Sequence, residues 1–154
     1  MSAVIDAGVL YALADDEDPG HKSVRAALEG ERGALLVPQS VLCEAGYLIG
    51  SRLGPRAEAA FVASLAAADW HLEPLVRVDL ERAAVLIDRY ADAGLGFVDA
   101  SIVAICERLG VHRIYTLDRR HFSLVRPGHV EAFELLPWRQ GSASTGPPRR
   151  GRSS

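Results

Sequence analysis

Short apolar runs that alternate with longer amphipathic segments constrain the fold of this chain most. Apolar runs at residues 3–5, 34–37, 70–75, 113–117 and 134–136 have the length and composition of strands. Between them, apolar residues recur with helical spacing over 9–13, 21–29, 39–53, 55–68, 80–90 and 98–109. The alternation predicts an α/β fold in three layers, in which helices cover both faces of a short central parallel sheet.

The length and composition predict one domain followed by a tail. A chain of 154 residues, of which 49% are hydrophobic, suits one ordinary core. Residues 140–154 are rich in Gly, Ser, Pro and Arg and offer no apolar side chains to bury. We therefore predict a domain over residues 1–139 and a disordered segment over 140–154.

Cysteine usage and hydropathy predict a cytoplasmic protein. Cys43 and Cys106 lie inside apolar helical patterns and do not form a spaced disulfide framework, so both are expected to be buried free thiols. The first residues lack the pattern of a secretory signal, and no apolar run is long enough to span a membrane.

Four acids stand at positions that allow them to converge, two at strand ends and two on the core-facing sides of helices. Asp6 and Asp118 directly follow apolar runs, and the carboxyl ends of such strands line the crevice of an open α/β sheet. Asp99 falls inside the apolar arc of its helix, and Glu44 lies at the edge of another apolar stripe. Carboxylates that converge repel one another unless they are protonated or bind a cation, and a hard divalent ion prefers oxygen ligands.

Each acid also has a simpler structural explanation. Asp6 and Asp99 are placed to cap helix N-termini, Glu44 is compatible with a surface acid, and Asp118 can pair with Arg119 or Arg120. The joint placement of all four favours a shared site.

The overall charge does not indicate nucleic-acid binding. The formal net charge is -3, whereas binding to phosphates usually relies on a basic surface. Lys22 is the only lysine, so arginine supplies the other basic side chains, and arginine can hold phosphate oxygens in bidentate fashion. The histidines are scattered without the spacing of a zinc site.

Five stretches carry a resemblance to a known family. They are 4–13 (VIDAGVLYAL), 40–44 (SVLCE), 96–104 (GFVDASIVA), 107–110 (ERLG) and 115–122 (YTLDRRHF). Together they resemble PIN-domain ribonucleases, and the second half resembles the toxin branch called VapC. The resemblance covers most of residues 3–137. Many relatives carry hydroxyl or amide side chains after the first Asp, where this chain has Ala7 and Gly8.

The resemblance implies a metal-dependent endoribonuclease, the toxin of a type II toxin-antitoxin system, that cleaves tRNA or rRNA. It implies Mg²⁺ as cofactor, with Mn²⁺ as a substitute, held by Asp6 and Asp99 with Glu44 and Asp118 completing the acidic pocket. It further implies a cognate antitoxin that plugs the acidic groove, and a homodimer. Thr116 is a candidate supporting hydroxyl near the acids, and Arg119 or Arg120 is a candidate contact to the phosphate. The histidines are expected to be surface or capping residues, with substrate contact by His21 and His121 as the alternative.

Two other readings remain. The same fold can serve as a non-catalytic RNA- or protein-binding module whose acids hold a structural cation; metal-dependent RNA cleavage distinguishes this alternative. A receiver-type signalling domain fits less well, because Lys22 lies far in sequence from the last strands.

Overall fold

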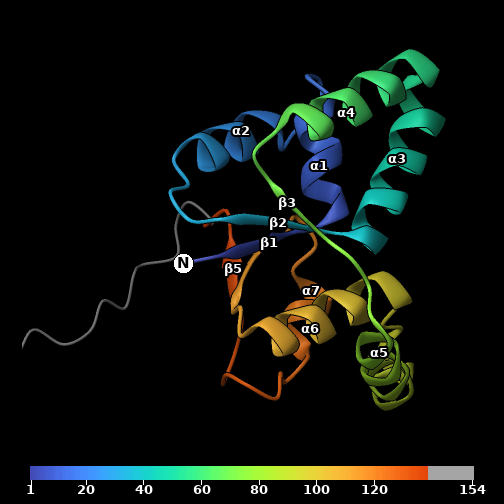
Figure 1. Ribbon diagram of the computed structural model, residues 1–154, viewed down its shortest axis with the longest axis vertical. Coiled ribbons are helices and arrows are strands. Elements are labelled where there is room, and N and C mark those ends of the chain that lie inside the picture. Colours follow the sequence, from blue (N-terminus) through green and yellow to red (C-terminus); the bar gives the residue numbers. More distant parts are fainter. Residues whose placement is uncertain (139–154) are drawn as a thin grey trace, which may run out of the picture.

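The computed structural model describes residues 1–138, so the predicted tail at 140–154 lies outside the described residues. Five parallel strands form one sheet in the order β3-β2-β1-β4-β5 (Figure 1). The strands are β1 (Ala3–Ile5), β2 (Leu35–Pro38), β3 (His71–Glu73), β4 (Arg113–Tyr115) and β5 (Glu134–Leu136). In the centre of the sheet, Val4 pairs with Leu36 on one side and with Ile114 on the other. The residues of β1 are fully buried, as expected for a strand with helices on both faces.

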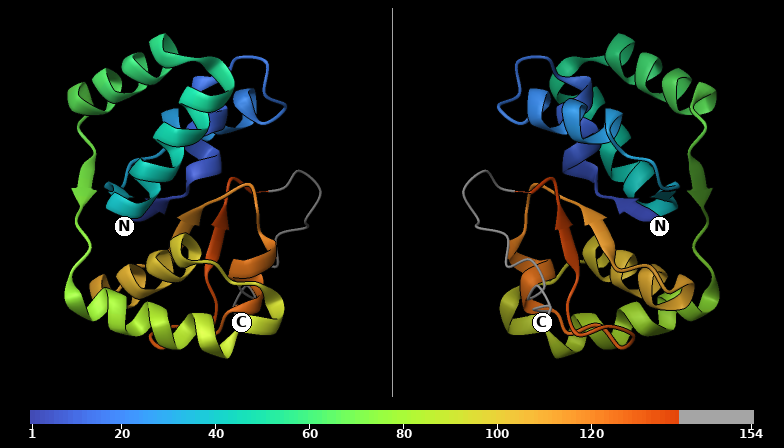
Figure 2. Two further views of the ribbon diagram at one scale, coloured as in Figure 1. Left: turned by 90° about the vertical axis from the view of Figure 1, so that its right-hand side faces the viewer. Right: turned by 90° about the vertical axis from the view of Figure 1, so that its left-hand side faces the viewer.

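Four helices cover one face of the sheet (Figures 1 and 2). They are α1 (Ala7–Ala14), α2 (His21–Glu29), α3 (Gln39–Leu53) and α4 (Pro55–Ala67). Gly54 joins α3 to α4 with a φ of 93°, a conformation that a side chain would strain, and Pro55 begins α4 because its missing N–H is not needed there.

The remaining helices cover the opposite face. They are α5 (Arg77–Arg89), the 3-10 turn η1 (Ala91–Ala93), α6 (Phe97–Leu109) and the short α7 (Arg120–Leu124). Figure 2 shows the sheet between these helices and the first four. The structure confirms the three-layer α/β architecture with a short parallel sheet.

The order of the strands creates a crevice beside β1. From β1 the chain proceeds to β2 and β3 on one side, then returns to place β4 and β5 on the other side. In open α/β sheets, such a reversal leaves a crevice at the carboxyl ends of the two strands where the order changes. Asp6 follows β1 and Thr116 follows β4, so both residues lie at this point.

Arg108 connects α6, α5 and β3 through an ionic network. Its Nε lies 2.8 Å from Asp79 Oδ1, and its Nη2 lies 2.9 Å from Glu73 Oε1. Asp79 is 1% exposed and also accepts a hydrogen bond from the Val76 N–H, which explains why α5 begins at Arg77 rather than at the predicted residue 80. The network fixes α6, the helix that carries Asp99.

One local prediction was wrong, and one short helix was not predicted. Cys43 is exposed, whereas Cys106 is buried as expected. The buried residues of α3 include Val41, Ala45 and Ile49, which share one side of the helix, and helical geometry turns Cys43 away from that side. The sequence reading also missed α7, whose five residues are too few to show a helical period. None of the helices in residues 1–138 combines the length and the apolar character needed to cross a membrane.

Candidate active site

Asp6 is the most buried of the four predicted acids. It caps α1, where its Oδ1 accepts a hydrogen bond of 2.7 Å from the Ala7 N–H, and its Oδ2 accepts one of 2.9 Å from Thr116 Oγ1. Burial and the nearby charge of Asp99 raise the pKa of Asp6 to about 6, although both hydrogen bonds act in the opposite direction. The helix-capping explanation is therefore correct, but it is incomplete, because a simple cap does not require a carboxylate inside an acidic field.

Asp99 lies in the first turn of α6 and is half-buried. Its Oδ2 lies 2.8 Å from Nδ1 of His121, on the neighbouring α7. The other ring nitrogen of His121 lies 3.2 Å from the Ala93 carbonyl oxygen, so two contacts orient the ring. Burial raises the pKa of Asp99, the hydrogen bond from His121 lowers it, and the charge of Asp118 raises it again.

Glu44 extends from the second turn of α3. The residue as a whole is exposed, yet its carboxyl group is partly desolvated, and this desolvation together with the charge of Asp99 raises its pKa. A buried contact between two hydroxyls, Ser40 Oγ and Ser101 Oγ at 2.6 Å, connects α3 to α6. This contact holds the helix that carries Glu44 against the helix that carries Asp99.

Asp118 lies on the loop after β4 and is exposed. Thr116 Oγ1 lies 3.0 Å from the backbone oxygen of Asp118 as well as near Asp6, so the threonine hydroxyl links the ends of β1 and β4. The side chain of Asp118 accepts a weak hydrogen bond from the Arg120 N–H at 3.3 Å.

The four acids lie within one electrostatic field. The charge of Asp99 raises the pKa of Asp6 and of Glu44, and the charge of Asp118 raises that of Asp99. Within residues 1–138, no three His, Cys, Asp or Glu side chains are grouped closely enough to hold a metal ion by themselves. The carboxylates nevertheless suit Mg²⁺, which takes one or two protein carboxylates and completes its coordination with water.

Three other residues singled out in the sequence are described by their local surroundings. His21 Nδ1 lies 2.7 Å from the Ala12 carbonyl oxygen, so His21 connects the start of α2 to α1. Arg119 donates a hydrogen bond to the Pro137 carbonyl. Nothing lies within 4 Å of the position that a Cβ would take at Gly8, so a side chain would fit there without a clash.

The sequence reading missed the roles of His121 and of the Ser40–Ser101 pair. His121 follows a short polar segment, and nothing in the sequence indicates that the segment folds back onto α6. Ser101 does stand among apolar residues of α6, and a fully buried hydroxyl requires a partner. The sequence therefore indicated that Ser101 needs a hydrogen-bond partner, but it did not indicate that this partner is Ser40.

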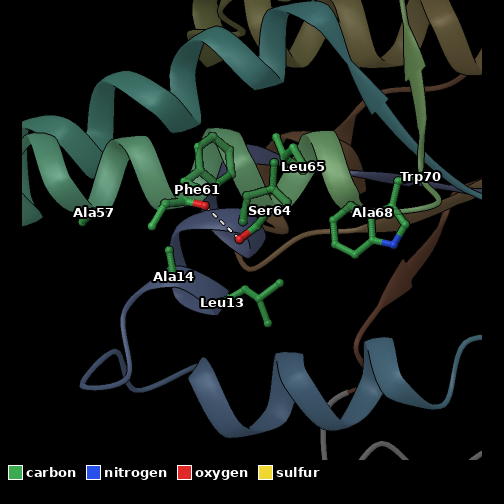
Figure 3. A pocket seen from close by; sticks show the side chains of 10 residues that line it. Leu13, Ala14, Ala57, Phe61, Ser64, Leu65, Ala68 and Trp70 are labelled. Atoms are coloured by element: carbon green, nitrogen blue, oxygen red, sulfur yellow. Dashed lines mark hydrogen bonds between the residues drawn. The ribbon is translucent and has the colours of Figure 1, made fainter.

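A separate hollow, whose lining contains none of the four acids, is apolar. About 400 Å³ in volume, it lies between the end of α1 and the length of α4, where Leu13, Phe61 and Leu65 line it with Trp70 at one end (Figure 3). Ser64 adds a hydroxyl, which donates a hydrogen bond to the Ala60 carbonyl. Because the lining contains no charged side chain, this hollow is not suited to a phosphodiester.

Comparison with known proteins gives the site its context. A family model described as PIN domain matches residues 3–126. Ribonuclease VapC26 of Mycobacterium tuberculosis is 35% identical over 134 residues, which are 87% of this chain and 99% of that protein.

Solved structures agree at the level of the fold. VapC20 from Mycobacterium tuberculosis, described as a sarcin-ricin loop cleaving toxin, superposes with a TM-score of 0.74 at 22% identity and covers 84% of this chain and 98% of its own. A toxin-antitoxin complex from Klebsiella pneumoniae superposes with a TM-score of 0.63 at 17% identity and covers 88% of this chain and 96% of its own. The chain therefore belongs to the PIN-domain family, within which it is similar to the VapC ribonucleases.

Proposed function

We propose that the protein cleaves RNA with the help of a divalent cation, preferably Mg²⁺, gathered by the acids at the carboxyl ends of β1 and β4. The observation that supports this proposal is that acids far apart in sequence converge: the charge of Asp99 raises the pKa of Asp6 and of Glu44, and the charge of Asp118 raises the pKa of Asp99. A surface on which acids raise one another's pKa values is destabilised unless a cation or protons offset the charge.

In this proposal, the residues divide the work between holding and orienting. Asp6 and Asp99 would hold the cation, with Glu44 and Asp118 adding negative charge at the rim of the pocket. Thr116 fixes the carboxylate of Asp6, and His121 fixes that of Asp99. When bound, the cation supplies a Lewis acid that activates water for in-line attack on a phosphodiester. Arg120, exposed beside Asp118, would contact the phosphate.

The direct test is cleavage of total cellular RNA by the purified protein. We expect discrete fragments with Mg²⁺ or Mn²⁺, no fragments with EDTA, and loss of cleavage in Asp99→Asn, which keeps the shape of the side chain but removes its charge. Mapping the fragment ends tests whether tRNA or rRNA is the target, and whether the cut leaves a 5′-phosphate. A folded, metal-loaded protein that leaves all RNA intact would favour the alternative, a non-catalytic binding module.

We also propose that a cognate antitoxin binds the protein. The structural neighbour from Klebsiella pneumoniae is a toxin-antitoxin complex, which supports a partner of this kind. The apolar hollow between α1 and α4 offers such a partner a surface on which to pack an apolar segment (Figure 3).

Co-expression with the product of an adjacent gene tests the partner. A stable complex that relieves growth arrest is the expected result. Ala60→Glu introduces a charge into the apolar hollow, so it should weaken the complex and leave cleavage intact. Equal affinity of Ala60→Glu and wild type for the antitoxin would exclude this hollow as the docking surface.

The predicted homodimer stays a prediction. Val62 on α4 and Val85 on α5 are about half exposed, at 54% and 48%, which leaves apolar side chains available for contact between copies. Light scattering of the purified protein measures the mass directly.

A further inference from the structure

A third hollow combines positive charge with an exposed aromatic ring. It has a volume of about 590 Å³ and lies between the start of α2 and the segment that follows β4. Lys22 and Ser23 line it from the first turn of α2, and Arg119 and Trp138 line it from the other side. The two walls pack directly on each other, because a Cβ at Gly20 would lie 2.9 Å from Leu117 Cδ1.

Trp138 presents its indole to solvent from an anchored backbone. The residue is 60% exposed, which is unusual for a large aromatic side chain. The two residues before it are held in place: the Leu136 carbonyl accepts a hydrogen bond of 2.7 Å from the Thr116 N–H, and the Pro137 carbonyl accepts one from Arg119. These hydrogen bonds at the end of β5 therefore hold the backbone of Trp138 close to Arg119.

The positive charge of this hollow stands out against the acidic whole. Lys22 is the only lysine of a chain whose net charge is -3. It lies in the first turn of α2, where the helix dipole adds partial positive charge, and Arg119 lies across the hollow. These features suit a phosphate, and the neighbouring indole suits the face of a nucleobase.

The hollow adjoins the acidic cluster. Thr116, whose hydroxyl donates to Asp6, is part of its lining. A further hollow of about 520 Å³, which contains Asp118 and Arg120, shares Leu117 and Arg119 with it. An RNA strand that is cut at the acids must also contact the protein surface beside them, and this hollow is part of that surface.

We propose that the hollow between α2 and Trp138 binds one nucleotide of single-stranded RNA beside the scissile phosphate, with the base stacked on Trp138 and its phosphate contacted by Lys22 and Arg119. This proposal rests on the proposed nuclease function and names the part of the surface that holds the substrate. Stacking accepts every base, so the contact contributes affinity and register more than sequence choice.

The experiment measures RNA binding in the cleavage-deficient Asp99→Asn background, so that binding is read without turnover. Trp138→Leu, which removes the ring but keeps an apolar side chain, should weaken the binding of a short single-stranded RNA by about tenfold. Trp138→Phe, which keeps a stacking face, should retain most of the affinity. In a further series, one nucleotide of the RNA at a time is replaced by an abasic one. The difference in affinity between the protein with Trp138 and the Trp138→Leu variant should disappear at one position of the RNA only.

A second measurement addresses the phosphate. Lys22→Ala should reduce the slope of the logarithm of the binding constant against the logarithm of salt concentration by about 0.7, the value for one phosphate contact in a single strand. The matched control is Arg56→Ala on α4, which removes the same charge outside the lining of this hollow and should leave the slope unchanged.

A direct optical signal complements both measurements. The chain has two tryptophans, so Trp70→Phe leaves Trp138 as the only indole, and RNA should quench its fluorescence. Unchanged affinity in both Trp138→Leu and Lys22→Ala would overturn the proposal. So would variants that bind RNA normally but lose the antitoxin, since the hollow would then dock a protein. If wild type proves unable to cleave RNA, the nuclease proposal fails by itself, and these binding measurements still decide the present one.

Discussion

Asp6 illustrates how one residue serves structure and chemistry at once. It caps α1, is 6% exposed, and stands in the field of Asp99 and Glu44. The cap requires only a hydrogen-bond acceptor, whereas binding a cation requires the charge. These two requirements can be separated by a substitution that keeps the acceptor and removes the charge.

Asp6→Asn should abolish cleavage and stabilise the metal-free protein. The amide oxygen still accepts the Ala7 N–H, while burial of a repelled carboxylate is avoided. We expect the melting temperature in EDTA to rise by about 3–6 °C, which corresponds to roughly 1–2 kcal/mol. Asp118→Asn, at an exposed position, is the control and should change it little. A lower melting temperature for Asp6→Asn in EDTA would contradict this view of the cluster.

His121 is predicted to act on the metal through Asp99. His121→Ala removes the contact of 2.8 Å that orients the Asp99 carboxylate. The Mg²⁺ concentration that gives half-maximal cleavage should rise by about 10–100-fold, as for other residues that orient a metal ligand. His121→Gln should recover part of the loss because it restores an N–H donor. His21→Ala, whose ring contacts the Ala12 carbonyl instead, serves as the matched control, and an identical Mg²⁺ requirement in the two alanine variants would exclude the proposed role.

At the scale of elements, the position of α6 depends on α5 and β3. Arg108 joins these elements, and its partner Asp79 is 1% exposed while Glu73 is 8% exposed. Removing the guanidinium of Arg108 leaves these buried carboxylates without a positively charged partner.

Arg108→Met should therefore lower the free energy of unfolding by about 3 kcal/mol, even though methionine keeps much of the apolar stem. Urea denaturation measures the change. Arg89→Met on the exposed side of α5 removes the same charge and should cost less than about 0.5 kcal/mol. Equal effects of the two substitutions would show that the network contributes little.

At the scale of the whole molecule, the two ends of the sheet treat carboxylates differently: at one end acids lie near other acids, and at the other end an acid is paired with an arginine. The acids gather at the carboxyl ends of the strands. At the amino ends, Glu31 is paired with Arg113 at 2.8 Å and accepts a hydrogen bond from the Tyr115 hydroxyl. The hydrogen bond from Arg113 lowers the pKa of Glu31 to about 2, with help from Tyr115 and against the effect of burial.

These two ends predict how stability depends on pH. Because the pKa of Glu31 is lower in the folded state, its contribution is fully present above about pH 4.5 and is lost as the pH falls toward 2. Asp6 acts in the opposite sense: its raised pKa makes the fold less stable as the pH rises through about 6. The metal-free protein should therefore be most stable at mildly acidic pH.

Glu31→Gln tests the acid side of this profile. At pH 7 it should cost on the order of 2–3 kcal/mol, and its unfolding free energy should converge with that of wild type near pH 2. Glu29→Gln, on an exposed pair with Arg25, should follow the wild-type profile. A constant difference between Glu31→Gln and wild type from pH 7 to pH 2 would show that the carboxylate of Glu31 is not the titrating group.

The sequence by itself determined the order of the strands and of the longer helices, the three-layer architecture and the membership in the PIN-domain family, because hydrophobic periods and motifs are local properties of a chain. It also placed Asp6 and Asp118 after strands, where the topology brings their ends together. Only the tertiary structure decided that His121 contacts Asp99, that Ser40 contacts Ser101, that Cys43 faces solvent and that Trp138 borders a charged hollow. These features depend on how helices rotate and pack against one another, and such contacts join residues whose separation along the chain leaves no local pattern to read.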